Sequence, residues 1–187
     1  TGYGGRLTGW IGSNLNGTYV GVDPNVPTYE GNQKLAQNLT PKDSTVSLLC
    51  KPFEDADVQR WNCAVDFAFT SPPYFDKERY AEDDTQSWVR YKSFDAWCAG
   101  FLRPLLAKAH ACLRPGGVFA LNIADVRSKG KAKHPLESES IAAGKAVGFT
   151  LDETLRFQMT PRVGYGLPEG MPEEPVFIFK KAKRVKG

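Results

Sequence analysis

The sequence predicts an α/β protein built on a mostly parallel sheet that helices cover on both faces. Short apolar runs of strand length alternate with stretches of helical spacing, which is the pattern of such sheets. Glycines, prolines and polar residues bound most of these runs, as turn residues do at strand ends. A length of 187 residues with 41% hydrophobic residues suffices for one core, so we predict a single domain over residues 1–187.

Two helices and two strands alternate in the first third of the chain, at residues 7–11, 18–22, 29–39 and 45–50. The second helix should end ahead of Pro41, because a proline ring cannot continue a helix. Asp23-Pro24 closes the first strand, and Lys51-Pro52 closes the second. Each strand therefore leads into a polar turn.

The rest of the chain continues this alternation around one long polar and aromatic loop, residues 71–93. Strands are predicted at 64–69, 118–123, 149–157 and 176–179, and helices at 94–113 and 137–147. Pro104 should kink the first of these helices or split it in two. The Arg-Pro-Gly-Gly turn at 114–117 and the Gly- and Pro-rich stretch 160–172 are predicted as loops.

The most informative segment is Asp66–Phe75, in which an apolar run ends in Thr-Ser, two prolines and two aromatic residues. Each proline fixes its φ angle and lacks an N–H group, so the carbonyls of this turn need not be tied up in a strand ladder. A hydroxyl and several carbonyls are thus placed beside an aromatic ring at the end of a strand. Such a shelf suits an enzyme that holds a planar amino group while a methyl group is delivered to it.

Candidate ligand-binding residues stand directly after three of the predicted strands. They are Asp23, the turn at 51–54 and the shelf at 71–74. In sheets of this kind, ligands bind outside the carboxyl ends of the strands. We therefore expect these residues to come together, although they are scattered in the sequence.

Four segments resemble motifs of the amino-methyltransferases that modify cytosine N4 or adenine N6 in DNA. Residues 70–74 (Thr-Ser-Pro-Pro-Tyr) are similar to their catalytic motif, and residues 2–6 (Gly-Tyr-Gly-Gly-Arg) to their S-adenosylmethionine loop. Residues 20–23 (Val-Gly-Val-Asp) resemble the strand that carries their ribose-binding acid. Residues 113–117 (Leu-Arg-Pro-Gly-Gly) resemble the turn before the fifth strand of many Rossmann-like methyltransferases.

The resemblance implies a Rossmann-like, S-adenosylmethionine-dependent methyltransferase with an antiparallel last strand. The residues that it implies for cofactor binding are Gly2, Tyr3, Gly4, Gly5, Asp23, Pro24, Phe53, Glu54 and Thr70. Among them, Asp23 would accept both ribose hydroxyls, and Phe53 would pack on the adenine while Glu54 or a nearby backbone group reads its edge. The implied catalytic residues are Ser71, Pro72, Pro73 and Tyr74.

The chemistry of the expected acceptor explains these residue types. An exocyclic amine on a base is a poor nucleophile, because its lone pair is delocalised into the ring. Hydrogen bonds from its two N–H groups to the Ser71 hydroxyl and the Pro72 carbonyl would help it to attack the methyl group. Tyr74 would stack on the base after the base is flipped out of the duplex. Positioning and electrostatics then supply most of the rate, and no metal is expected.

The target base stays open between cytosine and adenine. Thr-Ser-Pro-Pro-Tyr is most similar to the N4-cytosine enzymes, which favour serine before the prolines, although serine also occurs in N6-adenine enzymes. Methylation of RNA or of protein glutamine is a further alternative, whose families more often carry Asn or Asp at that position. An inactive methyltransferase-like DNA-binding module is the non-enzyme alternative, and a restriction–modification partner is left open.

The net charge of +3 is too small to indicate a nucleic-acid partner by itself. The residues predicted to contact DNA are Phe75, Arg127, Lys129, Lys131 and Lys133. Basic loops often contact phosphates, but a solvated surface run is the alternative for residues 127–133. No separate target recognition domain is evident.

The chain begins inside the predicted cofactor loop, whereas the related enzymes have a strand before that loop. We expect this central strand to come from an upstream segment or from another chain, since ladder groups are otherwise left unpaired. No apolar run approaches the ~18 residues that span a membrane, and no signal-peptide pattern opens the chain. The four cysteines show no metal-ligand spacing. A cytoplasmic protein of bacterial or phage type, associated with the nucleoid through DNA, is therefore expected.

Overall fold

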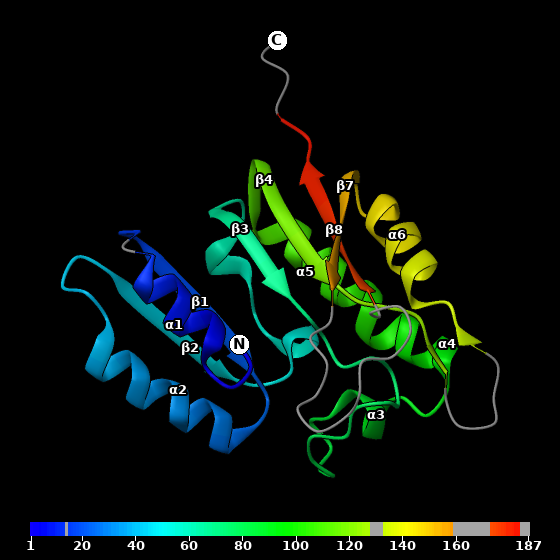
Figure 1. Cartoon of the computed structure of the whole chain (residues 1–187), viewed down its shortest axis with the longest axis horizontal. Coiled ribbons are helices and arrows are strands. Elements are labelled where there is room, and N and C mark those ends of the chain that lie inside the picture. Colours follow the sequence, from blue (N-terminus) through cyan, green and yellow to red (C-terminus); the bar gives the residue numbers. More distant parts are fainter. Residues whose placement is uncertain (14, 128–132, 159–172, 184–187) are drawn as a thin grey trace. The chain divides into compact units, whose positions relative to one another are not determined.

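The computed structural model describes residues 1–13, 15–127, 133–158 and 173–183 (Figure 1). The chain forms two compact units, of which the first comprises Thr1–Asp57 with Arg79–Arg90 and the second Val58–Glu78 with Tyr91–Gly187. The chain therefore crosses from one unit to the other after Asp57, Glu78 and Arg90. As a result, the segment that follows the predicted catalytic motif packs with the first unit, although the motif belongs to the second.

The first unit holds a two-stranded parallel sheet with a helical crossover. Its elements are α1 (Gly5–Gly12), β1 (Thr18–Asp23), α2 (Val26–Leu39), β2 (Thr45–Cys50), η1 (Phe53–Asp55) and α3 (Ser87–Arg90). The carboxyl ends of the two strands are neighbours, since Asp23 lies opposite Cys50 in the register. The predicted strand–helix–strand order is confirmed in this unit.

α2 begins at Val26 rather than at Tyr29, because the residues ahead of the predicted start form a good helix cap. The Asn25 Oδ1 accepts the backbone N–H of Thr28 at 3.0 Å. Pro27 occupies the first turn, where its missing N–H has no intrahelical partner to lose. Capping residues thus extend this helix beyond its apolar periodicity.

The second unit holds a four-stranded mixed sheet in the order β3-β4-β8-β7. The strands of the unit are β3 (Val65–Thr70), β4 (Leu113–Asn122), β5 (Val126–Arg127), β6 (Lys133–His134), β7 (Phe149–Gln158) and β8 (Glu173–Lys181). Its helices are η2 (Gln59–Trp61), α4 (Phe94–Trp97), η3 (Cys98–Leu102), α5 (Arg103–Cys112) and α6 (Leu136–Ala146). β8 runs antiparallel to both of its neighbours, whereas β3 and β4 are parallel. The predicted antiparallel last strand is therefore confirmed.

Aromatic rings fill the face of this sheet on which α5 and α6 pack (Figure 1). Phe119, Phe149 and Phe179 come from three different strands, and their ring centroids are 5.5 to 6.2 Å apart. All three rings are buried. A Cβ added to Gly144 of α6 would lie 2.7 Å from the Phe179 ring, so the helix approaches the sheet as closely as a glycine allows.

The long helix predicted after the polar loop is split, as Pro104 predicted. α4 continues into the π-helical segment η3, and α5 then starts with Pro104 in its first turn. A π segment accommodates the backbone hydrogen bond that a proline cannot make. Trp97 and Leu102 are fully buried at this break and fix the path of the helix.

Two features of the second unit differ from the prediction. The Arg-Pro-Gly-Gly turn lies within β4, and the pairing of β4 with β3 shifts register between Val65 and Phe67. β5 and β6 pair as a short antiparallel hairpin that the sequence does not indicate. The residues between these two strands, and the predicted loop 160–172, lie outside the described part of the chain.

In the described residues, the sheet β1-β2 of the first unit and the sheet β3-β4-β8-β7 of the second unit are separate. β1 stands at the end of one sheet and β3 at the end of the other, so each has an unpaired edge. The predicted central strand is not among the described elements. The helices of this part of the chain include none that is long and apolar enough to cross a membrane.

Candidate active site

The predicted catalytic residues follow β3 directly, at the carboxyl end of a strand that runs parallel to β4. Pro72 and Tyr74 are buried, while Ser71 and Pro73 are half-buried. The prolines end the strand because they cannot donate to a further ladder. The shelf therefore stands where ligands bind in sheets of this type.

Tyr74 is held from two directions. Its hydroxyl donates to the Glu174 Oε2 at 3.2 Å and lies 3.5 Å from the carbonyl oxygen of Asn122. Its backbone N–H donates to the Glu78 Oε2 at 3.0 Å. The start of β8 and the residues just after the motif thus fix the aromatic end of the shelf.

The environment of Tyr74 makes its hydroxyl a donor and not a base. Burial raises the pKa of Tyr74, the negative charge of Glu174 raises it further, and a hydrogen bond with the Ser71 side chain acts in the opposite direction. The ring is 4% exposed, with the Lys77 ammonium 5.9 Å from its centroid. The Tyr74 ring is therefore enclosed in this structure, with its hydroxyl bonded inside the second unit, and its stacking on a base stays a prediction.

Phe75 is a core residue of the second unit, and its predicted contact with DNA stays a prediction. Its ring is 6% exposed and packs against Phe94, Trp97 and His134, with centroids 5.7, 6.2 and 5.0 Å away. Its backbone is left-handed, with φ of 55°, which is rare for a bulky residue. The aromatic cluster offsets the cost of that conformation.

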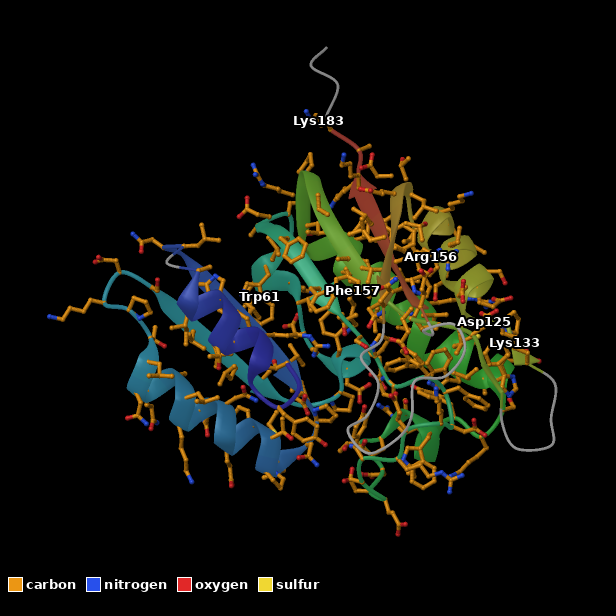
Figure 2. The ribbon with its side chains drawn as sticks, in the orientation of Figure 1. Trp61, Asp125, Lys133, Arg156, Phe157 and Lys183 are labelled. Carbon is orange, nitrogen blue, oxygen red and sulfur yellow. The ribbon has the colours of Figure 1, made fainter. Side chains whose placement is uncertain are left out.

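Two of the predicted basic contacts, Arg127 and Lys133, belong to the strands of the β5–β6 hairpin. Figure 2 shows Lys133 close to Asp125, and the Lys133 Nζ lies 3.1 Å from the Asp125 Oδ2. Asp125 in turn accepts the backbone N–H of Glu137 at 2.8 Å, so the carboxylate is fixed at the start of α6. The charge of Lys133 is therefore partly neutralised. Arg127 ends β5, whereas Lys129 and Lys131 lie outside the described residues.

The glycine loop is tied to the end of β1. The backbone N–H of Gly2 donates to the Asp23 Oδ2 at 2.9 Å, and its carbonyl accepts from the Asn32 Nδ2 at 2.9 Å. Gly4 has φ of 96°, and a Cβ there would lie 2.6 Å from the Leu35 Cδ1. The left-handed backbone conformation therefore favours glycine at this position.

Asp23 lies half-buried at the carboxyl end of β1. Besides the Gly2 bond, its Oδ1 accepts the backbone N–H of Asn25 at 3.1 Å. The Thr1 ammonium lies 3.7 Å from Oδ2 as well, whereas Oδ1 has a second lone pair with which it can still accept a hydroxyl hydrogen. Next to it lies an open groove of about 300 Å³, lined by Tyr3, Asn25, Pro27, Thr28, Gly31, Asn32 and Leu35.

Asn32 is a site residue that the sequence does not reveal. Its side chain is buried, and its Nδ2 donates to the carbonyls of Gly2 and Thr28 at 2.9 and 2.8 Å. Its Oδ1 is buried with no hydrogen-bond partner among the described residues. A buried acceptor that lines a groove is suited to a ligand N–H or hydroxyl. An asparagine on the inner face of a helix is the one available signal in the sequence.

The turn after β2 forms an ion pair with Arg90 of α3. The Arg90 Nη1 lies 3.1 Å from the Glu54 Oε1 and 2.8 Å from the Asp55 Oδ2. Burial raises the pKa of Glu54, while its interactions with Arg90 act in the opposite direction. The Glu54 Oε1 is therefore occupied by Arg90, and the predicted contact with the adenine edge stays a prediction. Phe53 beside it is half-buried.

The predicted cofactor residues divide between the two units. Gly2–Gly5, Asp23 and Pro24 come together in the first unit, with Phe53 and Glu54 on the turn after the neighbouring strand. Thr70 ends β3 and belongs to the second unit with the catalytic motif. Within the part of the chain that the structure describes, no group of three or more side chains is placed to hold a metal ion.

Solved structures of methyltransferases are similar to this chain. An S-adenosylmethionine-dependent methyltransferase from Methanosarcina mazei matches with a TM-score of 0.62 at 12% identity, over 98% of this chain and 90% of that one. A candidate DNA modification methylase from Thermus thermophilus, solved with S-adenosyl-L-methionine, matches with 0.53 at 16% identity, over 73% and 56%. The 1,6-didemethyltoxoflavin-N1-methyltransferase of Burkholderia thailandensis matches with 0.50 at 17% identity, over 97% and 79%.

These similarities establish the fold, which is the Rossmann-like fold of S-adenosylmethionine-dependent methyltransferases, as predicted. No protein-family model and no curated protein sequence matches the chain. The chain spans about half the length of the DNA modification methylase structures that it matches, from 48% to 56%. The reaction has to be argued from the residues of the site.

Proposed function

We propose that this protein transfers a methyl group from S-adenosylmethionine to an exocyclic amino group of a DNA base, with cytosine N4 as the preferred target. The observation that carries this proposal is the Ser-Pro-Pro-Tyr shelf at the carboxyl end of β3, within a methyltransferase fold. The shared fold of the Thermus candidate DNA modification methylase supports DNA as the substrate.

The first unit offers residues that fit the cofactor. Asp23 keeps acceptor capacity for the ribose hydroxyls, the glycine loop lets its backbone come close, and the unpaired Oδ1 of Asn32 lines the adjoining groove. When bound, S-adenosylmethionine supplies an electrophilic methyl group on its sulfonium sulfur. Tyr3 in the glycine loop and Phe53 after β2 provide aromatic surface near the strand ends.

The second unit offers the acceptor side. The Ser71 hydroxyl and the Pro72 carbonyl would accept the two N–H groups of the target amine, which helps its nitrogen to become pyramidal. We assign Tyr74 the role of holding this shelf, because Glu174 fixes its hydroxyl. Stacking of Tyr74 on a flipped base would require the ring to leave its buried position. The β5–β6 hairpin, with Arg127 and Lys133, is the element that we propose to contact DNA phosphates.

The direct test is incubation with labelled S-adenosylmethionine and DNA, followed by analysis of the nucleosides. We expect label in N4-methylcytosine. Label in N6-methyladenine would move the target to adenine, and label that appears only with RNA or protein would replace DNA as the substrate. Cofactor binding by calorimetry without any transfer would instead indicate a methyltransferase-like binding module.

Variants of the shelf test its role in transfer. Ser71→Ala and Tyr74→Ala should each lower the transfer rate by more than about 100-fold, since positioned hydrogen bonds contribute effects of that size. Cofactor affinity should survive in both, because the cofactor residues of the first unit are unchanged. Ser138→Ala, which removes an exposed hydroxyl on α6, is the matched control and should keep the full rate. Full rates in both shelf variants would contradict the proposal.

A further inference from the structure

The segment Arg79–Arg90 leaves the catalytic motif and packs with the first unit. It starts directly after Glu78, whose carboxylate accepts the backbone N–H of Tyr74 at 3.0 Å. It ends in α3, from which the chain returns to the second unit. We call residues 79–90 the strap. The strap is therefore joined covalently to the shelf and packed against the unit that carries the glycine loop.

The strap has an ordered structure of its own. The Trp88 Nε1 donates to the carbonyl of Ala81 at 3.0 Å, and the Arg79 guanidinium lies 4.8 Å from the Trp88 ring centroid. Gln86 and Ser87 are buried, at 5% exposure each. A segment closed on itself in this way moves as one body, in the manner of a compact surface loop.

Arg90 anchors one end of the strap. It donates to both carboxylate oxygens of Asp55, at 2.8 and 3.2 Å, and to the Glu54 Oε1 at 3.1 Å. The Glu54 side chain is 4% exposed and that of Arg90 is 27% exposed, so this cluster is shielded from water on one side. Paired guanidinium–carboxylate bonds of this kind are stronger than single hydrogen bonds and fix a geometry. Arg90 therefore holds this end of the strap firmly to the turn after β2.

Tyr80 anchors the other end and does so more weakly. Its ring meets that of Tyr3 edge to face, with centroids 6.4 Å apart. Tyr3 is 83% exposed and Tyr80 is 52% exposed, so this contact buries little surface. Tyr3 stands in the glycine loop, between the residue bonded to Asp23 and Gly4.

The two anchors stand at the two cofactor elements of the first unit. The Arg90 cluster lies on the turn after β2, and the Tyr3 contact lies on the loop tied to the end of β1. The carboxyl ends of these strands are neighbours in the sheet. We infer that the strap closes over the S-adenosylmethionine site, with Arg90 as its fixed hinge and the Tyr3–Tyr80 pair as the opening. This inference rests on the cofactor of the proposed function.

In such a strap, Arg90 is a positioning residue for the cofactor, although Arg90 itself touches none of the reacting atoms. Closure would hold the cofactor in place. Release of Arg90 should therefore weaken cofactor binding without changing the cofactor contacts themselves. Loss of the aromatic pair should speed entry and exit while the hinge persists.

The test measures the binding of S-adenosylhomocysteine by calorimetry, so that it does not depend on turnover. Arg90→Gln should weaken binding about tenfold, and Asp55→Asn should weaken it less, because the Arg90–Glu54 pair remains. The double variant should be no weaker than Arg90→Gln alone, because that substitution already removes the interaction with Asp55. Arg60→Gln, an arginine of the second unit that lies over Trp61, is the matched control and should bind as the unchanged protein does.

Each outcome decides a separate point. If the unchanged protein does not bind S-adenosylhomocysteine, the cofactor of the proposed function is wrong. If it binds, and Arg90→Gln and Asp55→Asn bind equally well, the strap is wrong while the proposed function stands. Circular dichroism establishes that each variant is folded, and Asp55→Asn, at an exposed position, carries the test if Arg90→Gln fails to fold. Tyr80→Ala should raise the dissociation rate of S-adenosylhomocysteine in stopped-flow measurements. An unchanged rate would show that the strap does not open at the Tyr3–Tyr80 contact.

Discussion

Tyr74 is buried because its polar atoms find partners inside the second unit. The hydroxyl reaches Glu174, a residue 100 positions later in the chain, and the backbone N–H reaches Glu78. A buried phenol is tolerated when its hydroxyl is hydrogen-bonded, since the desolvation cost is then offset. The shelf is thus fixed by a contact between distant parts of the sequence. Its rigidity comes from Glu174 as much as from the two prolines.

Tyr74→Phe tests the contribution of this contact to stability. It keeps the ring but leaves the Glu174 carboxylate without its donor, so we expect a loss of about 1–3 kcal/mol in the free energy of unfolding. Urea denaturation measures this loss. Tyr29→Phe is the matched control, because the Tyr29 hydroxyl accepts from Gln33 within α2, and it should cost less than about 1 kcal/mol. Equal effects of the two substitutions would show that the Glu174 contact is no stronger than a local one.

At the scale of the elements, local sequence signals predicted the strands well. β2 spans the predicted residues, and β1, β3 and β7 differ from theirs by one residue at their ends. Apolar runs that stop at polar or proline-containing turns explain this agreement. The β5–β6 hairpin could not be predicted, because strands of two residues are too short to show an alternation of apolar and polar residues. The Arg-Pro-Gly-Gly segment was placed in a loop because its pairing depends on β3, which is distant in the sequence.

The residues of the candidate site show the same difference between local and distant sequence signals. The glycine loop and Asp23 could be predicted, because each is a short local pattern at a strand boundary. Three other residues could not be predicted, because their hydrogen-bond partners are distant in the sequence. The distances are 30 residues for Asn32, 35 for Arg90 and 100 for Glu174. The burial of Tyr74 and Phe75 could not be predicted for the same reason. It depends on contacts with β8 and with α4. The composition of a motif indicates its chemistry, whereas its exposure is decided by residues far along the chain.

The contact between α6 and the sheet makes a prediction at the scale of one element. Gly144→Ala would place a methyl group 2.7 Å from the Phe179 ring, so the helix or the ring must move. We expect a loss of about 1–3 kcal/mol in the free energy of unfolding, which is typical of an overpacked core. Gly31→Ala in α2 is the control, because a Cβ there meets nothing within 4 Å. It should raise stability by up to about 1 kcal/mol, since alanine favours a helix. A Gly144→Ala protein with unchanged thermal and urea unfolding would refute this close packing.

At the scale of the whole molecule, the two halves of the proposed reaction belong to different units. The glycine loop and Asp23 stand in the first unit, and the shelf at residues 71–74 stands in the second. The strap is the segment that carries the chain from the shelf to the first unit and back. The prediction of a single domain stays a prediction.

This division predicts where the cofactor changes the protection of backbone amides. Ligand at about 100 times its Kd stabilises the binding-competent state by about 2.7 kcal/mol, which slows exchange through openings that release it by about 100-fold. Hydrogen exchange with S-adenosylhomocysteine should therefore slow most in the glycine loop, at the carboxyl ends of β1 and β2, and in the strap. β7 and β8 should change much less, because they belong to the second unit and exchange through openings that need not release the ligand. Adenosine at the same concentration is the control for weak binding through the adenine alone. Protection concentrated in β7 and β8 would mean that the cofactor binds elsewhere, and protection spread evenly would mean that the two units open together.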